Sequence, residues 1–375
     1  MIKVLFLIGT LNGGGAEKIL VDTVNNLSPR KYQITVQTIL NDGIYKDKLL
    51  PHIRYKTIIS FKKGLIRSCI FKFLFNICGC KFVHRLFVNE DYDYEISFLE
   101  GLSTNIISQS VNKKSKKYTW LHTDINCCAN SYLMFGSEEK EIRAYNKFDK
   151  IFCVSEHVKE SLMQKYKIEE KKLQVLYNIV DDGFISVASM EQAELPCVAR
   201  PIFMSAGRLV KVKGYDRLLR VHKRLIDEGL LHSLVIIGDG AEKQNLRKYI
   251  NENHLNNTAF LIGFQENPYK YFSKADLFVC SSLAEGFSTV VSEAIICGVP
   301  VLSTNVSGAN EPLELPRCSV IVDNTEQGIY IGIKKLLQNP ESLTNLRRDV
   351  LNKKKIINKE KLIKEFEKEV FNITE

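Results

Sequence analysis

Short apolar segments alternate with longer amphipathic segments along almost the whole chain, and this alternation limits the fold more than any other feature. The short segments, which we expect to be strands, are residues 2–8, 33–39, 55–59, 93–98, 117–121, 149–154, 173–177, 201–206, 233–238, 259–263, 277–281, 300–304 and 318–322. Segments with helical periodicity follow most of them, for example 16–27 and 157–166. Such alternation predicts parallel sheets covered by helices on both faces.

The length of the chain and one break in the pattern predict its domains. A chain of 375 residues exceeds the size of one typical core and suits two domains. No convincing strand occurs between Asp181 and Arg200. We therefore predict an α/β protein with two Rossmann-like, doubly wound domains that face a central cleft. The predicted parts are a first domain over 1–182, a linker over 183–200, a second domain over 201–352, and a C-terminal helix over 353–375 that packs back toward the first domain.

Composition excludes several classes of protein. No run of about 20 apolar residues is present, so a spanning helix is not expected. The first eight residues form a short apolar run without a basic leader, which predicts a buried strand rather than a signal peptide. The ten cysteines are scattered without a Cys-x-x-Cys pair, as in a reduced, cytoplasmic protein without a disulfide framework or zinc site.

The net charge of +9 is concentrated in one notable segment. Residues 49–89 contain no acidic residue, and large apolar residues separate their basic ones. Such a segment is typical of a surface that binds anionic lipid, with Lys62, Lys63, Arg67 and Lys72 as the candidate contacts. The alternative is a solvated basic helix whose apolar face belongs to the core. No nucleic-acid-binding motif accompanies the charge, so nucleic acid is not an expected partner.

The first predicted strand runs into a glycine-rich loop, Gly9 to Gly15, and then into a helix. Glycines let a backbone approach a ligand closely, and a helix N-terminus offers N–H groups to an anion. The spacing is not that of the dinucleotide-binding fingerprint. A tight turn without a ligand would explain this loop equally well.

The second half carries more specific signals. Arg208 and Lys213 flank the loop that follows a predicted strand, where a guanidinium and an ammonium could clamp a diphosphate leaving group. Downstream, Glu285 is expected in a loop and Glu293 in the helix that begins near Ser288. The N-terminus of that helix would direct N–H groups at a ligand.

Together these motifs resemble glycosyltransferase family 4 (glycosyl transferases group 1), which are retaining enzymes of the GT-B fold. The resemblance rests on the order of Gly207-Arg208-Leu209, Lys213-Gly214, Glu285 and Glu293 separated by seven residues, and Gly298-Val299-Pro300. It extends over nearly the whole chain through less specific positions: Gly14-Gly15, His122, Val154-Ser155, Asn178, Gly238-Asp239-Gly240 and Gly263.

The resemblance implies a role for each matching residue. Arg208 and Lys213 would bind the donor diphosphate and stabilise the charge that develops on it. Glu293 would bind the ribose, and Glu285 would lie beside the transferred sugar. The remaining expected contacts are backbone N–H groups of Phe287, Ser288 and Thr289, the close approach of Gly14 and Gly15 to phosphate, His122 beside the sugar, and Gly263 to Gln265 around the base.

The implied reaction moves a hexose or N-acetylhexosamine from a nucleoside-diphosphate sugar to a lipid-linked, polyprenyl-diphosphate glycan. Bacterial surface polysaccharide (capsule, O-antigen or exopolysaccharide) would be the product, uridine diphosphate is the nucleotide favoured in the family, and the enzyme would lie on the inner face of the cell membrane. Neither a metal nor a cofactor is expected, because cationic side chains and helix dipoles replace the metal. The alternatives are a sugar-nucleotide epimerase and a non-catalytic, glycosyltransferase-like binding subunit.

Overall fold

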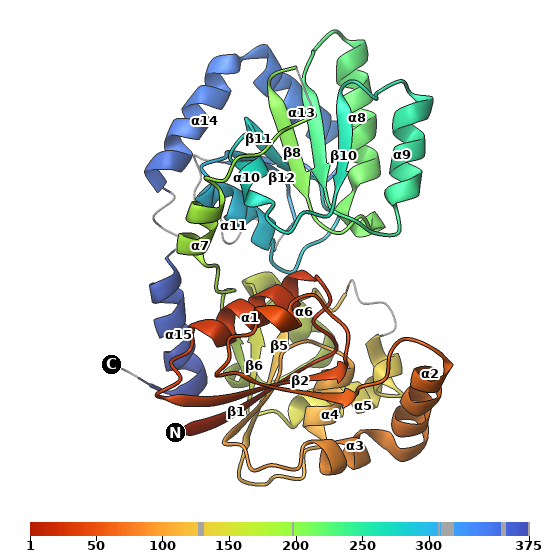
Figure 1. Ribbon diagram of the computed structural model, residues 1–375, viewed down its shortest axis with the longest axis vertical. Coiled ribbons are helices and arrows are strands. Elements are labelled where there is room, and N and C mark those ends of the chain that lie inside the picture. Colours follow the sequence, from red (N-terminus) through yellow and green to blue (C-terminus); the bar gives the residue numbers. More distant parts are fainter. Residues whose placement is uncertain (127–130, 197–198, 307, 309–318, 354–357, 374–375) are drawn as a thin grey trace. The chain divides into compact units, whose positions relative to one another are not determined.

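The computed structural model describes residues 1–126, 131–196, 199–306, 308, 319–353 and 358–373. Its contacts divide the chain into two compact units (Figure 1). Unit 1 comprises Met1–Ile179 and Glu360–Glu375, and unit 2 comprises Val180–Lys359.

Unit 1 is built on a seven-stranded parallel sheet in the order β3-β2-β1-β4-β5-β6-β7. The strands are β1 (Ile2–Ile8), β2 (Tyr32–Leu40), β3 (Arg54–Ile59), β4 (Tyr94–Ser97), β5 (Lys116–Leu121), β6 (Lys150–Cys153) and β7 (Leu173–Val175). β1 pairs with β2 from Ile2 opposite Tyr32 to Ile8 opposite Thr38. Val4 to Ile8 are fully buried, which explains the unbroken apolar run of a strand covered on both faces.

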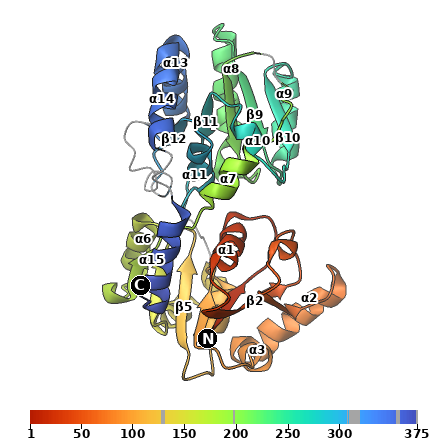
Figure 2. The same ribbon diagram turned by 60° about the vertical axis from the view of Figure 1, so that its left-hand side comes forward.

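Helices connect the strands of unit 1. They are α1 (Gly15–Asn26), α2 (Leu65–Lys72), α3 (Gly79–Phe87), α4 (Leu102–Ser108), α5 (Glu138–Asn146) and α6 (Glu156–Tyr166), with a π-helical turn (Phe73–Cys78) between α2 and α3. The last helix, α15 (Lys359–Phe371), lies against the same sheet beside β5 (Figure 2). Phe366 stacks on Trp120 at 5.4 Å between ring centroids, and Phe371 packs against Tyr32 and Tyr94.

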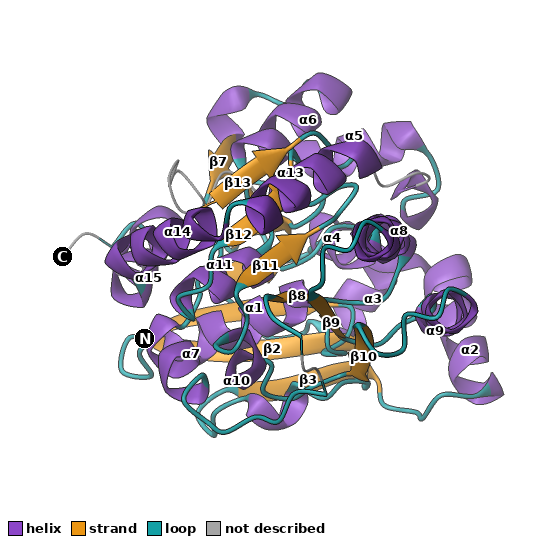
Figure 3. Cartoon of the chain, turned by 90° about the horizontal axis from the view of Figure 1, so that it is seen from above, coloured by secondary structure: helices purple, strands orange, loops and turns teal. Residues whose placement is uncertain are grey.

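Unit 2 contains a six-stranded parallel sheet in the order β10-β9-β8-β11-β12-β13. The strands are β8 (Ile202–Ala206), β9 (Ser233–Ile237), β10 (Ala259–Gly263), β11 (Leu277–Cys280), β12 (Val301–Thr304) and β13 (Ser319–Val322). Figure 3 shows these strands between two groups of helices. One core packs α8 (Tyr215–Asp227), α9 (Lys243–Glu252) and α13 (Glu326–Gln338) on the sheet, and the other packs α7 (Asp182–Ala188), α10 (Tyr269–Phe272) and α11 (Thr289–Ile296).

The structure differs from the sequence prediction around residues 183–200. They were predicted to be a linker, but the contacts place them in unit 2, where they contain most of α7. Asp181 caps this helix through its carboxylate, which accepts the Phe184 N–H at 2.9 Å, while Ile185 and Ala188 join the core. The chain passes between the units at residues 179–180 and 359–360.

All thirteen predicted strands are confirmed to within about two residues at each end. The helix α14 (Pro340–Lys353) precedes α15. Residues 354–357 and 374–375 of the predicted C-terminal helix, 353–375, lie outside the described part. None of the helices in the described ranges is long and apolar enough to cross a bilayer.

Candidate active site

Lys213 reaches the site because the chain turns tightly after β8. Lys211 to Lys213 form one 3-10 turn, and Gly214 then adopts a left-handed conformation with φ of +64°. A Cβ atom at Gly214 would lie 2.2 Å from the backbone oxygen of Ser281, so only glycine allows this approach. The loop after β8 is thereby packed directly against the loop after β11.

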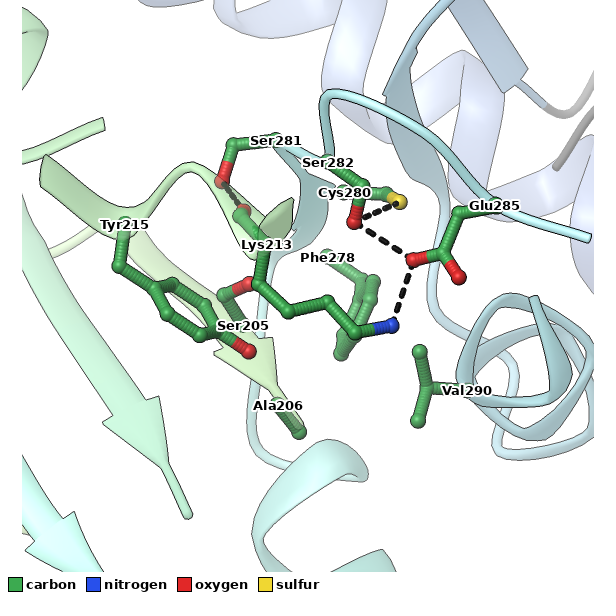
Figure 4. Close-up of a pocket in the computed structure, with 10 residues that line it drawn as sticks. All are labelled: Ser205, Ala206, Lys213, Tyr215, Phe278, Cys280, Ser281, Ser282, Glu285 and Val290. Atoms are coloured by element: carbon green, nitrogen blue, oxygen red, sulfur yellow. Dashed lines mark hydrogen bonds and ion pairs between the residues drawn. The ribbon is translucent and has the colours of Figure 1, made fainter. Parts of the chain in front are cut away.

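Lys213 and Glu285 form the ion pair at the centre of the site (Figure 4). The Lys213 Nζ lies 2.6 Å from Glu285 Oε1, and the Ser282 hydroxyl donates to the same oxygen at 2.6 Å. The side chains of Lys213 and Glu285 are 20% and 9% exposed. A carboxylate with two donors in such a partly dry position is held in one orientation.

This ion pair borders a small cavity at the carboxyl ends of β8 and β11. Its lining residues are Ser205, Ala206, Lys213, Tyr215, Phe278, Cys280, Ser281, Ser282, Glu285 and Val290. Burial raises the pKa of the Tyr215 hydroxyl and of the Cys280 thiol, so both are neutral at neutral pH. Lys213 and Glu285 therefore supply the charges of this cavity.

Arg208, the other predicted clamp residue, is not among the residues that line the cavity. It follows β8 by two residues, and its side chain is exposed. The guanidinium forms no hydrogen bond or ion pair with another residue that the structure describes.

Two further predicted contacts lie in the helix α11 or directly before it. Glu293 is buried, with 5% exposure, and accepts a hydrogen bond from the Tyr269 hydroxyl at 3.1 Å. Ser288 precedes the helix, and its backbone N–H donates to the Gly308 carbonyl at 3.2 Å. That N–H group, expected to contact the donor, is therefore already used in this structure.

The predicted base-binding segment, Gly263 to Gln265, follows β10. The side-chain amide of Gln265 is tied within the unit, donating to the Ile262 carbonyl at 2.9 Å and accepting from the Tyr271 hydroxyl at 3.2 Å. The side chain of Phe264, between Gly263 and Gln265, is 52% exposed. The Gly263 carbonyl already accepts the Gly238 N–H at 2.9 Å, so the segment offers chiefly one exposed ring.

The predicted site residues of the first domain follow the carboxyl ends of two strands of unit 1. Gly14 and Gly15 come after β1, and His122 comes after β5. Gly14 caps α1 without a side-chain hydrogen bond, and Gly15 begins that helix. The N–H of His122 donates to the Glu100 carboxylate at 3.0 Å, and its ring packs 5.0 Å from that of Phe98. Burial lowers the pKa of His122 to about 3 and raises the pKa of Glu100, so the imidazole is neutral at neutral pH.

Three residues of these sites were missed by sequence reasoning: Ser282, Tyr269 and Glu100. Glu100 carried a usable signal, because it is an acidic residue just after a buried strand, where parallel sheets place their functional groups. Ser282 lies only three residues before Glu285 in a loop. Tyr269 had no such signal, since the chain separates it from Glu293 by 24 residues.

Family models match both halves of the chain. The model described as Glycosyl transferases group 1 matches residues 191–353, and the model described as Glycosyltransferase Family 4 matches residues 132–184. The chain belongs to the family 4, group 1 glycosyltransferases.

Curated relatives match this glycosyltransferase over part or nearly all of its length. An N-acetylgalactosamine-N,N'-diacetylbacillosaminyl-diphospho-undecaprenol 4-alpha-N-acetylgalactosaminyltransferase of Campylobacter jejuni is 29% identical over 95% of this chain and 94% of its own. The O-antigen biosynthesis glycosyltransferase WclY of Escherichia coli is 25% identical over 60% of this chain and 54% of its own. The structure of Anabaena HepE with UDP and glucose has a TM-score of 0.79 at 17% identity and full coverage of both chains. That likeness shows the GT-B fold.

The surface prediction for the glycosyltransferase needs one correction. Arg67, predicted to contact lipid, turns inward: its side chain is only 11% exposed, and its NH1 lies 2.7 and 2.6 Å from the two carboxylate oxygens of Asp42. The sequence could not reveal this pair because Asp42 lies 25 residues earlier, outside the acid-free segment. Lys62, Lys63 and Lys72 are exposed.

Proposed function

We propose that this glycosyltransferase moves a hexose or N-acetylhexosamine from a UDP-sugar to a lipid-linked glycan, with retention of configuration and without a metal ion. The observation that supports this proposal most is the Lys213–Glu285 ion pair, together with the exposed Arg208 in the loop after β8. The Campylobacter jejuni relative, whose acceptor is a diphospho-undecaprenol glycan, and the UDP complex of HepE support the choice of acceptor and nucleotide. The relatives named for O-antigen synthesis support a role in surface polysaccharide.

The cations explain how the leaving group departs. Arg208 would offer a fork of donors to the diphosphate and Lys213 a point charge, so both stabilise the negative charge that grows as the glycosidic bond breaks. In this scheme the bond from the anomeric carbon to the phosphate oxygen breaks while the acceptor oxygen bonds to the same face. The acceptor's proton passes to the departing phosphate oxygen.

Glu285 would serve the sugar rather than the phosphate. Lys213 and Ser282 already hold one of its oxygens, Oε1, so the other oxygen can accept a sugar hydroxyl in a fixed position. Its negative charge would also stabilise the positive charge that develops on the sugar ring. A buried Glu293, oriented by Tyr269, would accept the ribose hydroxyls.

Cationic side chains are proposed to replace a divalent ion. Within the ranges that the structure describes, no group of three or more His, Cys, Asp or Glu side chains could hold a metal. Mg²⁺ and Mn²⁺ in transferases need carboxylate ligands beside the phosphates. Glu285, the carboxylate beside Lys213, is already engaged by a cation.

We further propose that the enzyme docks on the cytoplasmic face of a membrane through residues 61–87, here called the docking segment. Leu74 and Val83 of this segment are buried, but seven of its apolar side chains are exposed to an extent that no packed core explains: Phe61 51%, Leu65 87%, Ile66 66%, Phe73 54%, Ile77 76%, Phe82 45% and Leu86 52%. Exposed lysines, including Lys62, Lys63 and Lys72, accompany them. Apolar insertion together with attraction to anionic headgroups is the pattern of an interfacial helix.

The test is transfer from a panel of nucleotide sugars to a synthetic polyprenyl-diphosphate glycan, with the anomeric configuration of the product read by NMR. We expect transfer from a UDP-sugar with an α-linked product from an α-linked donor. An inverted product would contradict the proposal of retention. Conversion of the donor into its epimer without any acceptor would instead identify an epimerase, and stable donor binding without turnover would identify a binding subunit.

A further inference from the structure

The helix α2 at the start of the docking segment is anchored to the rest of unit 1 in an unusual way. None of its eight residues is buried, so it has no apolar side chain fixed in the core. Its partly buried residues are Arg67, Ile70 and Phe71. Phe71 packs on Phe75 of the following turn, with 4.7 Å between ring centroids, whereas the Arg67 guanidinium pairs with both oxygens of Asp42. The position of α2 therefore depends strongly on this ion pair and on whatever covers its exposed face.

Asp42 lies in a loop that holds the glycine-rich loop in place. The Asp42 carbonyl accepts the Leu11 N–H at 2.9 Å, and the Leu11 carbonyl accepts the Tyr45 N–H at 3.1 Å. Between these two bonds, a Cβ atom on Gly43 would lie 2.1 Å from the Leu11 backbone. Leu11 itself is fully buried. The two loops are thus locked backbone to backbone.

Arg67 of α2 thus bonds to Asp42, and Asp42 bonds to Leu11, from which the chain continues directly into Gly13, Gly14 and Gly15. A weakly packed element at one end of such a series of bonds opens locally at low cost in free energy. Covering its exposed face with a bilayer would fix it, and each bonded contact would then restrain the next.

We infer that the Arg67–Asp42 pair couples binding of an anionic bilayer to the conformation of the glycine-rich loop, so that Arg67 is a positioning residue and not a lipid contact. This inference rests on the docking part of the proposed function. It gives the enzyme a means of ordering the loop predicted to approach the donor phosphate only when the lipid-embedded acceptor is near. Asp42 should therefore matter as much as any exposed lysine of the docking segment for the effect of a bilayer on the glycine-rich loop.

Hydrogen–deuterium exchange at the Leu11 amide tests the coupling directly, because that N–H donates to the Asp42 carbonyl. We would compare the full-length protein with and without phosphatidylglycerol vesicles, as wild type, Asp42→Asn, Arg67→Met and the charge-exchanged Arg67→Asp/Asp42→Arg. The matched control is Arg54→Met, which removes a second arginine–carboxylate pair, 2.8 Å from Glu90, in the same acid-free segment. Flotation with the same vesicles is measured for every variant.

We expect vesicles to slow exchange of the Leu11 amide several-fold in wild type and in Arg54→Met. Asp42→Asn and Arg67→Met should float as wild type does but lose that slowing, and the charge-exchanged variant should regain part of it. A merely structural pair would change exchange equally with and without vesicles, which would overturn the inference. Equal slowing in wild type and Asp42→Asn would also overturn it. Wild type that does not float removes the docking proposal and the coupling together, whereas glycosyl transfer, assayed separately, would stand.

Discussion

The ammonium of Lys213 lies 2.6 Å from Oε1 of Glu285, the same oxygen that the Ser282 hydroxyl contacts. Two predicted site residues, 72 positions apart in the chain, are therefore one unit in the structure. Removing either changes the environment of the other, so their kinetic effects are expected to be non-additive. Arg208, which has no such partner in the described ranges, offers a simpler test of the clamp.

Replacing Arg208 by alanine is expected to damage catalysis without damaging the fold. Loss of one cation at the leaving group costs on the order of 3–5 kcal/mol of transition-state stabilisation, which lowers kcat/KM by about 10²–10³-fold or more. The melting temperature should not change, because the side chain is exposed. The neighbouring exposed Lys211→Ala is the matched control and should retain full activity. Activity of Arg208→Ala within tenfold of wild type would remove the residue from the site.

Lys213→Ala is expected to lose activity to a similar extent and stability as well. It leaves the Glu285 carboxylate, 9% exposed, with Ser282 but without its cation. Removing one bonding partner of a largely buried polar group lowers the free energy of unfolding by about 1–3 kcal/mol. Denaturant unfolding of Lys213→Ala beside Arg208→Ala measures the difference. Equal stability of the two variants would mean that the ion pair contributes nothing to the fold.

The two glutamates are expected to separate kinetically. Glu293→Gln should mainly raise the donor KM, because ribose contacts are the same in the ground and transition states, and Glu285→Gln should mainly lower kcat. Tyr269→Phe should raise the donor KM by a smaller factor, since it removes only the hydroxyl that orients Glu293. Steady-state kinetics over a donor series decides this. The opposite assignment of KM and kcat effects would show that the two roles are exchanged.

Transfer is expected to survive chelation. In the proposed site, Arg208 and Lys213 neutralise the diphosphate, so turnover in excess EDTA should stay within about twofold of the untreated enzyme. Protein dialysed against EDTA and then assayed with and without added Mn²⁺ gives the measurement. Loss of turnover that a divalent ion restores would contradict the metal-independent mechanism.

The parts of the fold that sequence predicted were those with a local signal. Inner strands such as β9 and β11 are buried on both faces and carry apolar runs, so they could be located from the sequence. α7 could not, because its Phe-Ile-Ser-Val sequence has no helical pattern and its ends depend on the Asp181 cap and on the core of unit 2. The pairs Arg67–Asp42 and Tyr269–Glu293 form between residues distant in the chain, which no local pattern reveals.

Charge reversal in the docking segment is expected to release the enzyme from anionic vesicles. Lys62, Lys63 and Lys72 are exposed, and each basic group near such a surface contributes about 1 kcal/mol. The variant with all three changed to Glu should fail to float at low salt while still binding the donor. Replacing Lys248, Lys274 and Lys335 of unit 2 by Glu changes the net charge equally and should leave flotation intact. If wild type does not float either, the segment does not bind membranes.

A buried pair of histidines in unit 2 is expected to make the fold sensitive to mild acid. The Nδ1 of His232 lies 2.8 Å from the Leu230 carbonyl, so it must carry a proton and donate. Its Nε2 then accepts from His222 Nδ1 at 2.8 Å, and His222 Nε2 faces the Thr258 hydroxyl at 3.0 Å. A further proton on His232 Nε2 would set N–H against N–H in a dry site. Burial accordingly lowers the pKa of His232 to about 4 and that of His222 well below its ordinary value.

Because both folded pKa values are depressed, the unfolded chain binds more protons than the folded one below pH 6.5, and stability is lost as the pH falls. Between pH 7.5 and 5.5 the pair should cost about 2–3 kcal/mol of unfolding free energy, roughly half from each ring. Urea unfolding at the two pH values, followed by a probe placed in unit 2, measures this loss of stability. The amides of the double variant His222→Gln/His232→Gln do not titrate. Over the same pH change, this variant should therefore lose about 2–3 kcal/mol less unfolding free energy than wild type. His254→Asn, at an exposed position of the same unit, should keep the wild-type pH dependence. An unchanged pH dependence in the double variant would show that other groups cause the acid sensitivity.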